Sequence, residues 1–224
     1  YKFNLDVARV GVEISDPMIG QLRLKWWYDA VSNIGTGKVP NHPTVVILNR
    51  VFSQYNLDPA VLQSVVEAYV EQLIMARHIN LAGLLSNLDK TLGRLSELII
   101  HIIDGVCSDE AVKAGFHIAR ASGLSNLIRN LPKTISRGRV YIPEDICCSE
   151  AVSTLDLMEL NSQRLLSSGV IKVIRAIVEV AEDELHQGRK LRNFIDRSTR
   201  PVLLTGTIAG QELAAIKASG FDPR

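Results

Sequence analysis

The sequence predicts an all-α protein, a single domain built as a helical bundle over residues 1–224. Apolar residues recur at helical spacing (i, i+3, i+4) along nearly the whole chain. Alternation with a period of two, which marks a strand, appears only at 139–142 and is too short for a sheet. No repeat, low-complexity run or Pro/Gly/Ser-rich linker divides the 224 residues.

Signals of an N-terminal cap followed by proline position the first four helices. Aspartate caps a helix N-terminus and proline fits its first turn, so Asp16-Pro17 ends a helix running from Val7 and starts a second one. His42-Pro43 starts a third helix. Asp58-Pro59 starts a fourth, whose apolar positions continue to Ile74 as one stripe.

The second half of the chain is predicted to hold longer helices. Residues 84–103 are apolar nearly all round, which is typical of a helix inside a bundle. Ser108 caps a helix over 111–131, which we expect to end at Pro132 because proline breaks helix interiors. After an irregular basic segment over 132–148, we expect a long helix around 160–186 and a last one after Pro201.

Composition limits the classes of function. The 25 Lys and Arg against 24 Asp and Glu give a net charge of +1, so we expect no nucleic-acid partner. The best apolar stretch, 98–106, is interrupted by His101 and Asp104 and falls short of the ~18–20 residues of a membrane span. Contact with a membrane surface stays open. The chain starts without Met or a signal pattern, and we expect residues upstream of Tyr1 to be missing.

The segment 124–143 is the most informative for chemistry. Asn126 and Asn130 lie one helical turn apart, with Arg129 and Lys133 alongside. Arg137-Gly138-Arg139 then adds two guanidinium groups around a glycine that permits a tight turn. Such a cluster is suited to a phosphate or diphosphate. The alternative, a solvated basic loop at a helix end, stays open at this point.

This segment resembles the second signature of the squalene/phytoene synthase family, Asn-x-x-Arg-Asp-x-x-x-Asp followed by Arg-Gly-Arg-x-Tyr-x-Pro. Residues 20–30 resemble the Arg-x-Gln-Trp-Trp-x-Asp-Ala helix of that family, and 201–223 its C-terminal helix, which ends in Gly-x-Asp-Pro. The resemblance covers essentially the whole chain and implies an isoprenoid-synthase-type bundle around a central cavity. The matching residues of the second signature are Asn126, Arg129, Arg137, Gly138, Arg139, Tyr141 and Pro143.

Enzymes of this family condense two prenyl diphosphates head to head, with Mg²⁺ held by two aspartate-rich helices. Here the first motif, Asp-Asp-x-x-Asp, aligns with 8–12, and the second places its aspartates at Asn130 and Thr134, so each aligned acid is neutral or, at Arg9, positive. Carboxylate charge offsets the dehydration of Mg²⁺, so we expect no metal and no cofactor. Asp6 is either a stray ligand or, as we favour, the surface partner of Arg9.

The acid-depleted pattern resembles the branch of the family that contains the mitochondrial complex I assembly factor of squalene/phytoene-synthase type and its alphaproteobacterial relatives. This resemblance implies a non-catalytic protein that binds an isoprenoid or diphosphate or assists respiratory-complex assembly. The alternative is an active head-to-head prenyltransferase, which would need Mg²⁺. The expected location is the cytoplasm of a bacterium, with membrane contact open, or the mitochondrial matrix of a eukaryote. The matching residues are Tyr1, Phe3, Asn4, Asp6, Ala8, Arg9, Ser15, Asp16, Pro17, Ile19 and Gly20.

The expected ligands and partners are a prenyl diphosphate or another isoprenoid anion and a protein of respiratory-complex assembly. We assign no catalytic and no metal-binding residue. We expect the helix face with Asn126 and Asn130 to point into the cavity, opposite the helix with Arg9. The candidate binding residues are Arg9, Asn126, Arg129, Asn130, Lys133, Arg137, Arg139 and Tyr141.

Other clusters of polar or aromatic residues favour structural interpretations. The pairs Glu179/Asp183 and Glu182/His186 are predicted to form an exposed acidic helix face rather than a cation site. Trp26 and Trp27 are expected in the core and cavity wall rather than as a base-stacking platform. Local partners are expected for His78, His101 and His117, and the role of small hydrophobes for Cys107, Cys147 and Cys148.

Overall fold

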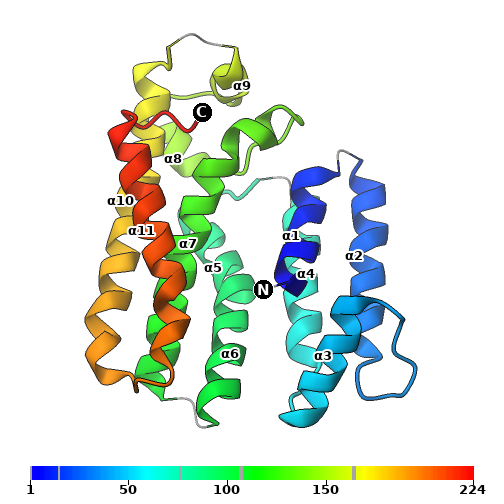
Figure 1. The fold of residues 1–224 in the computed structure, drawn as a ribbon. Coiled ribbons are helices and arrows are strands. Elements are labelled where there is room, and N and C mark those ends of the chain that lie inside the picture. The colour runs from blue at the N-terminus through cyan, green and yellow to red at the C-terminus, as the bar shows by residue number, and fades with distance from the viewer. Residues whose placement is uncertain (1, 15, 76, 106–107, 163–164) are drawn as a thin grey trace. The chain divides into compact units, whose positions relative to one another are not determined.

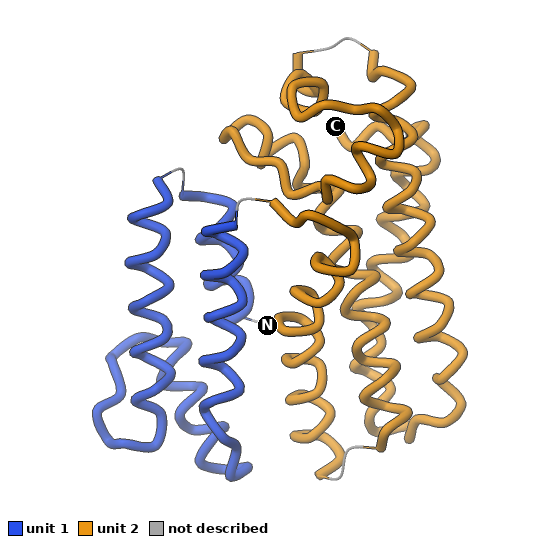
Figure 2. The backbone as a smooth tube through the Cα atoms, turned by 180° about the vertical axis from the view of Figure 1, so that it is seen from behind, with its two compact units in different colours: residues 1–75 blue, residues 76–224 orange. Residues whose placement is uncertain are grey.

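The computed structural model describes residues 2–14, 16–75, 77–105, 108–162 and 165–224, and every regular element in these ranges is helical. The predicted all-α fold class is therefore confirmed. The chain separates into two compact units, residues 1–75 and 76–224, and each is described by itself (Figures 1 and 2). The single-domain organisation stays a prediction.

The described residues of unit 1 form four helices. The core forms where α2 packs against α4 and where α1 contacts the other three helices. Phe3 of α1 meets Trp27 of α2 edge to face, with ring centroids 5.6 Å apart, and both side chains are buried. The four helices are α1 (Lys2–Glu13), α2 (Pro17–Ser32), α3 (Pro43–Gln54) and α4 (Ala60–Met75).

The predicted caps of unit 1 are present. The Asp16 carboxylate accepts a hydrogen bond from the Met18 backbone N–H at 2.8 Å, with Pro17 in the first turn of α2. The Asp58 carboxylate likewise accepts from the Ala60 N–H at 2.9 Å, where α4 begins. These local signals fix the helix starts. Ser15, which also belonged to the sequence resemblance, lies outside the described residues, as does Tyr1.

Unit 2 is organised around α7, which packs against α10, α11, α6 and a π-helical turn, η1. Figure 1 shows α7 running beside α10 and α11 along most of its length. The elements of unit 2 are α5 (Leu81–Leu88), η1 (Asp89–Gly93), α6 (Arg94–Asp104), α7 (Asp109–Ile135), α8 (Glu144–Ser149), α9 (Thr154–Met158), η2 (Glu159–Asn161), α10 (Ser168–Lys190), η3 (Leu191–Phe194), η4 (Arg200–Leu203) and α11 (Leu204–Ala218).

The core of unit 2 lies between α7 and α10. Leu124 and Ile128 of α7 pack in one cluster with Ile174 and Ile177 of α10, and all four are fully buried. Burial of each such side chain stabilises the fold by roughly 1.5–3 kcal/mol. This core fixes the position of α7, the helix that carries most of the candidate site.

Two predictions about α7 and the following segment were wrong. Pro132 lies inside α7, which continues to Ile135. Proline removes one backbone N–H, but the next turn stays intact, because the Pro132 carbonyl accepts from the Ser136 N–H at 3.1 Å and from the Asn161 amide at 2.7 Å. The segment expected to be irregular over 132–148 also contains most of α8.

Two further helix predictions need correction. Residues 84–103, which were expected to form one α-helix, belong to three successive elements, α5, η1 and α6. The π-helical turn η1 interrupts the regular α-helix. The long helix expected around 160–186 begins at Ser168, because the Ser167 hydroxyl caps it by accepting from the Val170 N–H at 3.3 Å.

Candidate functional site

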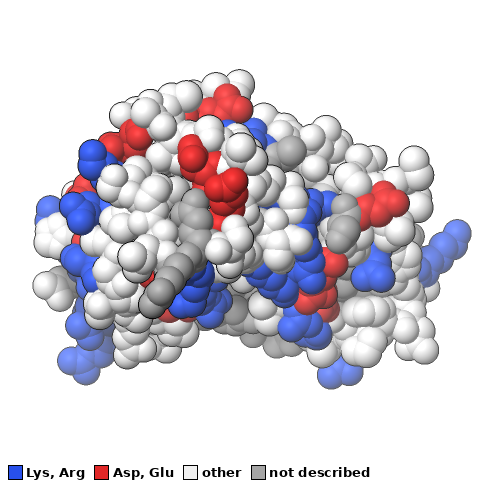
Figure 3. Space-filling view, turned by 90° about the horizontal axis from the view of Figure 1, so that it is seen from above, with Lys and Arg blue, Asp and Glu red and all other residues white. Residues whose placement is uncertain are grey.

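The end of α7 and the turn after it form the most basic part of the chain. Between Ala111 and Pro143 there are six Lys and Arg and no Asp or Glu. Figure 3, the view from above, shows Lys and Arg side chains gathered in clusters on this face, with acidic side chains among them. The acid-free stretch gives α7 a local positive charge that the net charge of +1 conceals.

Three of the predicted site residues lie together on α7. The Arg129 guanidinium donates to the Asn126 side-chain oxygen at 2.7 Å, and the Asn130 amide donates to the Asn126 carbonyl at 2.8 Å. Asn126 and Asn130 are both half-buried, whereas Arg129 is exposed. Both asparagines are thus tied to their own helix. Whether their face looks toward the helix of Arg9 stays a prediction.

Glu212 of α11 is a member of this cluster that sequence reasoning missed. One of its carboxylate oxygens lies 3.1 Å from the Arg129 guanidinium, and the other accepts from the Ser125 hydroxyl at 2.6 Å. Glu212 therefore neutralises part of the charge of Arg129 and joins α11 to α7. No motif around Glu212 pointed to this contact, because it depends on the packing of two distant helices.

A glycine-dependent turn terminates α7. The Arg139 N–H donates to the Thr134 carbonyl at 3.0 Å and the Gly138 N–H to the Ile135 carbonyl at 2.8 Å, the two bonds of a Schellman motif. Gly138 has φ +73°, and an added Cβ would meet no atom within 4 Å. The turn therefore needs glycine for its backbone conformation and not for space. It brings Arg137 and Arg139 to the end of α7.

The chain after the turn is held in place from residues 77–81. The Arg77 guanidinium donates to the Ile142 carbonyl at 2.7 Å, and the Leu81 N–H donates to the Asp145 carboxylate at 3.0 Å. Tyr141 and Ile142 are buried. Arg137, Arg139 and Tyr141 all have interaction partners within the protein, so an anion bound here would share or displace them. Lys133 is exposed.

The aligned metal positions do not fit Mg²⁺. Thr134 is buried and its hydroxyl donates to the Leu131 carbonyl at 3.1 Å, while the Asn130 amide is bound to its own helix. Ala8 and Val12 offer no side-chain oxygen, and Arg9 is a cation. Within the described ranges, no group of three or more His, Cys, Asp or Glu is placed to hold a metal ion. A protein site for Mg²⁺ depends on carboxylate oxygens, whose charge offsets the dehydration of the ion, and none of these five residues has a carboxylate.

The predicted ion pair between Asp6 and Arg9 is wrong. The Asp6 carboxylate binds the Lys2 ammonium at 2.7 Å and the Thr44 hydroxyl at 3.0 Å, whereas the Arg9 guanidinium lies 3.9 Å from Glu13. Burial alone raises the pKa of Asp6, but the hydrogen bonds from Lys2 and Thr44 outweigh it and lower the pKa. Both observed pairs, Lys2–Asp6 and Arg9–Glu13, have the i, i+4 spacing of a helix, whereas the expected pair of Asp6 and Arg9 would have i, i+3 spacing.

A polar network fastens the middle of α7 to its neighbours. The Arg120 guanidinium donates to both oxygens of Asp89 in η1, at 2.7 and 2.8 Å, and to Glu184 of α10 at 3.1 Å. The other oxygen of Glu184 lies 2.6 Å from the His117 ring. Hydrogen bonding to Asp89 raises the pKa of Arg120 despite partial burial. The expected local partner of His117 is confirmed.

The other clusters have mixed outcomes. Glu182 binds the Lys217 ammonium at 2.8 Å, in keeping with the predicted acidic surface. His78 is buried, and its Nε2 atom has no hydrogen-bond partner among the described residues, so its expected local partner is absent at that atom. Cys147 is buried as expected, but Cys148 is exposed, and Cys107 lies outside the described residues.

The tryptophan pair divides between core and surface. Trp27 is buried against Phe3, in agreement with the prediction. Trp26 exposes 42% of its surface, so its assignment to the core was wrong. Adjacent residues of a helix point about 100° apart, and here only Trp27 falls on the buried side of α2.

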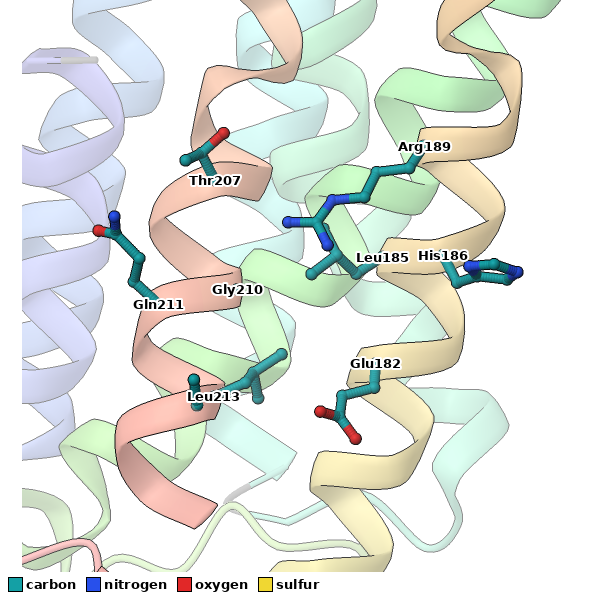
Figure 4. A pocket seen from close by; sticks show the side chains of 9 residues that line it. Glu182, Leu185, His186, Arg189, Thr207, Gly210, Gln211 and Leu213 are labelled. Atoms are coloured by element: carbon teal, nitrogen blue, oxygen red, sulfur yellow. The ribbon is translucent and has the colours of Figure 1, made fainter. Parts of the chain in front are cut away.

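A pocket of about 440 Å³ lies between α10 and α11 (Figure 4). Arg189 reaches from α10 toward Gly210 of α11, where an added Cβ would come within 2.8 Å of the guanidinium. Glu182, which also lines the pocket, is bound to Lys217. None of the predicted site residues lines this pocket. The His186 ring is directed away from α11, as Figure 4 shows.

Comparison with known proteins identifies relatives in sequence. The model of the squalene/phytoene synthase family matches residues 1–224. "NADH dehydrogenase (ubiquinone) complex I, assembly factor 6" is similar at 26% identity in Homo sapiens and 25% in Mus musculus, in each case over 98% of this chain. The chain spans 65% of the length of these relatives.

Solved structures share the fold. Squalene synthase HpnC from Alicyclobacillus acidocaldarius superposes with a TM-score of 0.81 at 19% identity, over 99% of this chain and 82% of that one. A dehydrosqualene synthase in complex with a ligand gives a TM-score of 0.81 at 16% identity, over 99% and 77% of the two chains. At these identities the similarity establishes the fold class alone.

Proposed function

We propose that this chain, which belongs to the squalene/phytoene synthase family, has kept the fold of the family without its metal-dependent chemistry and acts as an assembly factor for respiratory complex I. The observation that carries the proposal is the absence of carboxylates from all five aligned metal positions: Ala8, Arg9, Val12, Asn130 and Thr134. The similarity to complex I assembly factor 6 over 98% of the chain supports it.

The loss of the acids removes the physical basis of the family reaction. Ionisation of a diphosphate ester requires that the developing negative charge be neutralised, which bound Mg²⁺ supplies in the family enzymes. The side chains of Asn130 and Thr134 are bound to their own helix. We therefore assign no catalytic residue, and an active prenyltransferase is the alternative that the experiments below must distinguish.

The proposed partner is a protein of complex I or of its assembly. The proposed location is the mitochondrial matrix in a eukaryote, or the cytoplasm in a bacterium, where contact with a membrane surface stays open. None of the helices in the described residues is both long enough and apolar enough to cross a membrane.

Deletion of the gene in its source organism tests the assembly role. We expect less assembled complex I on native gels and lower NADH:ubiquinone activity, with both restored by re-expression of the wild-type chain. A variant with Asn130→Asp is the matched control for chemistry, since it restores one aligned acid at a half-buried position and should bring no gain in complex I. Normal complex I together with a changed isoprenoid profile in the deletion strain would favour the prenyltransferase.

We further propose that the end of α7 binds an isoprenoid anion directly, without metal. The supporting observations are the two cations near the end of α7, Arg129 and Lys133, of which Arg129 is paired with Glu212, and the turn that brings Arg137 and Arg139 to the same end. Guanidinium groups bind phosphate oxygens in pairs, and each charge-assisted bond contributes roughly 1.5–3 kcal/mol. Asn126, Arg129, Asn130, Lys133 and Tyr141 complete the proposed site on unit 2, whereas the remaining candidate, Arg9, belongs to unit 1.

Calorimetric titration with a non-hydrolysable prenyl diphosphate in EDTA tests this site. The double variant Arg137→Ala and Arg139→Ala should bind at least tenfold more weakly than the wild type, because two charged contacts are lost. Arg192→Ala and Arg197→Ala, exposed arginines elsewhere in unit 2, form the matched control and should bind normally. Equal binding by all three proteins would remove the anion site and leave an ordinary solvated basic loop.

A further inference from the structure

An apolar stripe runs along α2 on the side away from the core. Met18, Leu22 and Trp26 follow one another at i, i+4 and i+8, so they lie on one face of the helix, and Ile19 lies beside them. Met18 exposes 71% of its surface, Leu22 66% and Trp26 42%.

Packing within unit 1 does not explain this stripe. The buried residues of α2 are Gly20, Leu24, Trp27, Ala30 and Val31, which occupy the opposite side of the helix at 100° per residue. An amphipathic surface helix normally presents charged or polar residues to water. Here α2 is apolar on two sides.

The exposed surface continues onto α3. The His42 ring, at the start of α3, lies 5.3 Å from the Trp26 ring, and Val46 follows one turn later with its N–H bonded to the His42 carbonyl at 3.0 Å. Val46 and its neighbour Ile47 are both exposed. We call the set Met18, Ile19, Leu22, Trp26, Val46 and Ile47 the α2–α3 patch.

Two exposed cations flank the α2–α3 patch, and one exposed acid, Asp16, caps α2 beside Met18. Arg23 of α2 and Arg50 of α3 are exposed, and neither forms an ion pair within the described part of the chain. The only acidic residue within α2, Asp29, is bound by the Lys25 ammonium at 2.6 Å. An apolar face with a tryptophan, flanked by unneutralised cations, is typical of an element that lies in the interface of an anionic bilayer.

We propose that the α2–α3 patch is a membrane-docking surface, which inserts its apolar side chains between the headgroups of an anionic lipid bilayer while Arg23 and Arg50 bind lipid phosphates. This inference is independent of the assembly role, because it concerns unit 1 and the assembly and anion proposals do not use these residues. A result that contradicts membrane docking would therefore not contradict the assembly role, and the reverse also holds.

The size of the patch favours a lipid surface over a second copy of this chain. A stable protein interface engages about 20–30 residues on each side. The patch has six apolar residues, and the span from Met18 to Trp26 is eight residues, or about 12 Å of helix. Two cations facing each other across a symmetric dimer would also repel, whereas an anionic bilayer complements them.

Flotation with vesicles measures the binding. We expect the wild type to float with vesicles of equimolar phosphatidylcholine and phosphatidylglycerol and to bind pure phosphatidylcholine more weakly. Met18→Gln with Leu22→Gln should reduce partition at least tenfold, since both side chains would leave the acyl boundary. Arg23→Gln with Arg50→Gln should reduce it by roughly fivefold per cation, and added salt should have the same effect.

The matched control substitutes two apolar residues of unit 2 that are equally exposed. Leu155 and Phe194 expose 67% and 70% of their surfaces, so Leu155→Gln with Phe194→Gln removes similar area elsewhere. This control should bind like the wild type. Because the chain has only two tryptophans, Trp26 and Trp27, their fluorescence should also shift to shorter wavelength on vesicle binding, and the shift should be lost in Trp26→Phe.

Three results would overturn the proposal. The first is a wild-type chain that floats with neither vesicle. The second is an equal loss of binding in the Met18/Leu22 variant and in the Leu155/Phe194 control. The third is a wild-type chain that forms dimers in sedimentation, is dispersed by the Met18/Leu22 changes and ignores lipid, which would assign the patch to self-association.

Discussion

Replacement of Arg120 by methionine tests the network that holds α7 against η1 and α10. The guanidinium makes two bonds to Asp89 and one to Glu184, all between 2.7 and 3.1 Å. None of the three side chains exposes more than 27% of its surface. Arg120→Met keeps most of the aliphatic volume, so the change removes the charge and leaves two carboxylates without their main partner.

The expected loss lies between two limits. Removal of one partner from a fully buried ion pair costs roughly 3–5 kcal/mol, and removal from an exposed pair typically under ~1 kcal/mol. With partial burial, we expect Arg120→Met to lower the free energy of unfolding by about 2–3 kcal/mol. Urea unfolding followed by helical circular dichroism measures this difference.

Arg94 supplies the matched control. Its guanidinium lies 2.7 Å from Glu97 on the same helix, but both side chains are much more exposed than those of the Arg120 network. Arg94→Met should therefore lower the free energy of unfolding by less than ~0.5 kcal/mol. If Arg120→Met proves no more destabilising than Arg94→Met, the network does not hold α7, and the reasoning from its geometry fails.

Three further predictions concern protons, backbone and metal. Burial lowers the pKa of His78 below its usual value of about 6.5, so the unfolded state binds more protons and stability falls as the pH drops below ~6.5; His78→Phe should flatten this loss in unfolding experiments, whereas the exposed His186→Phe should not. Gly123→Ala should lower the free energy of unfolding by about 1–3 kcal/mol, because the added Cβ would lie 2.4 Å from a Leu88 methyl carbon. Gly138→Ala should lower it by about 1 kcal/mol, for the positive φ alone. Equal losses of stability in urea unfolding would contradict this difference. Millimolar Mg²⁺ alone should leave the melting temperature unchanged, since a ligand stabilises a protein only by binding its native state, and a rising melting temperature would count against the loss of the metal site.

Much of the fold could be predicted because its signals are local. The Asp16 carboxylate accepts a hydrogen bond from the Met18 N–H, and the Ser108 hydroxyl accepts one from the Ala111 N–H. In both cases a short stretch of sequence contains both partners. The end of α7 could not be predicted in this way. Its continuation past Pro132 is accompanied by a bond from Asn161, which lies 29 residues away in the sequence.

The candidate site shows the same division between local and distant information. The contacts of Arg129 with Asn126 and of Asn130 with Asn126 follow from helical spacing. Glu212 and Arg77 escaped notice because their partners, Ser125, Arg129 and Ile142, lie 65 or more residues away. Trp26 was misplaced because an apolar residue on a helix predicts burial, and the exposed apolar face of α2 departs from that rule.

The acids that are missing and the residues that remain have different physical roles. Gly138 shapes the turn through its positive φ, and Tyr141 and Ile142 fill the core, so their loss would damage the fold with or without a substrate. Aspartates at positions 130 and 134 would serve a metal, and without it their charges would lie on a helix end where Thr134 is buried. Asn130 and Thr134 instead satisfy their hydrogen bonds within α7. Under the proposed function, substitution at these two positions removes the metal ligands and leaves the helix stable, which is the combination expected of a chain selected for its surface rather than for catalysis.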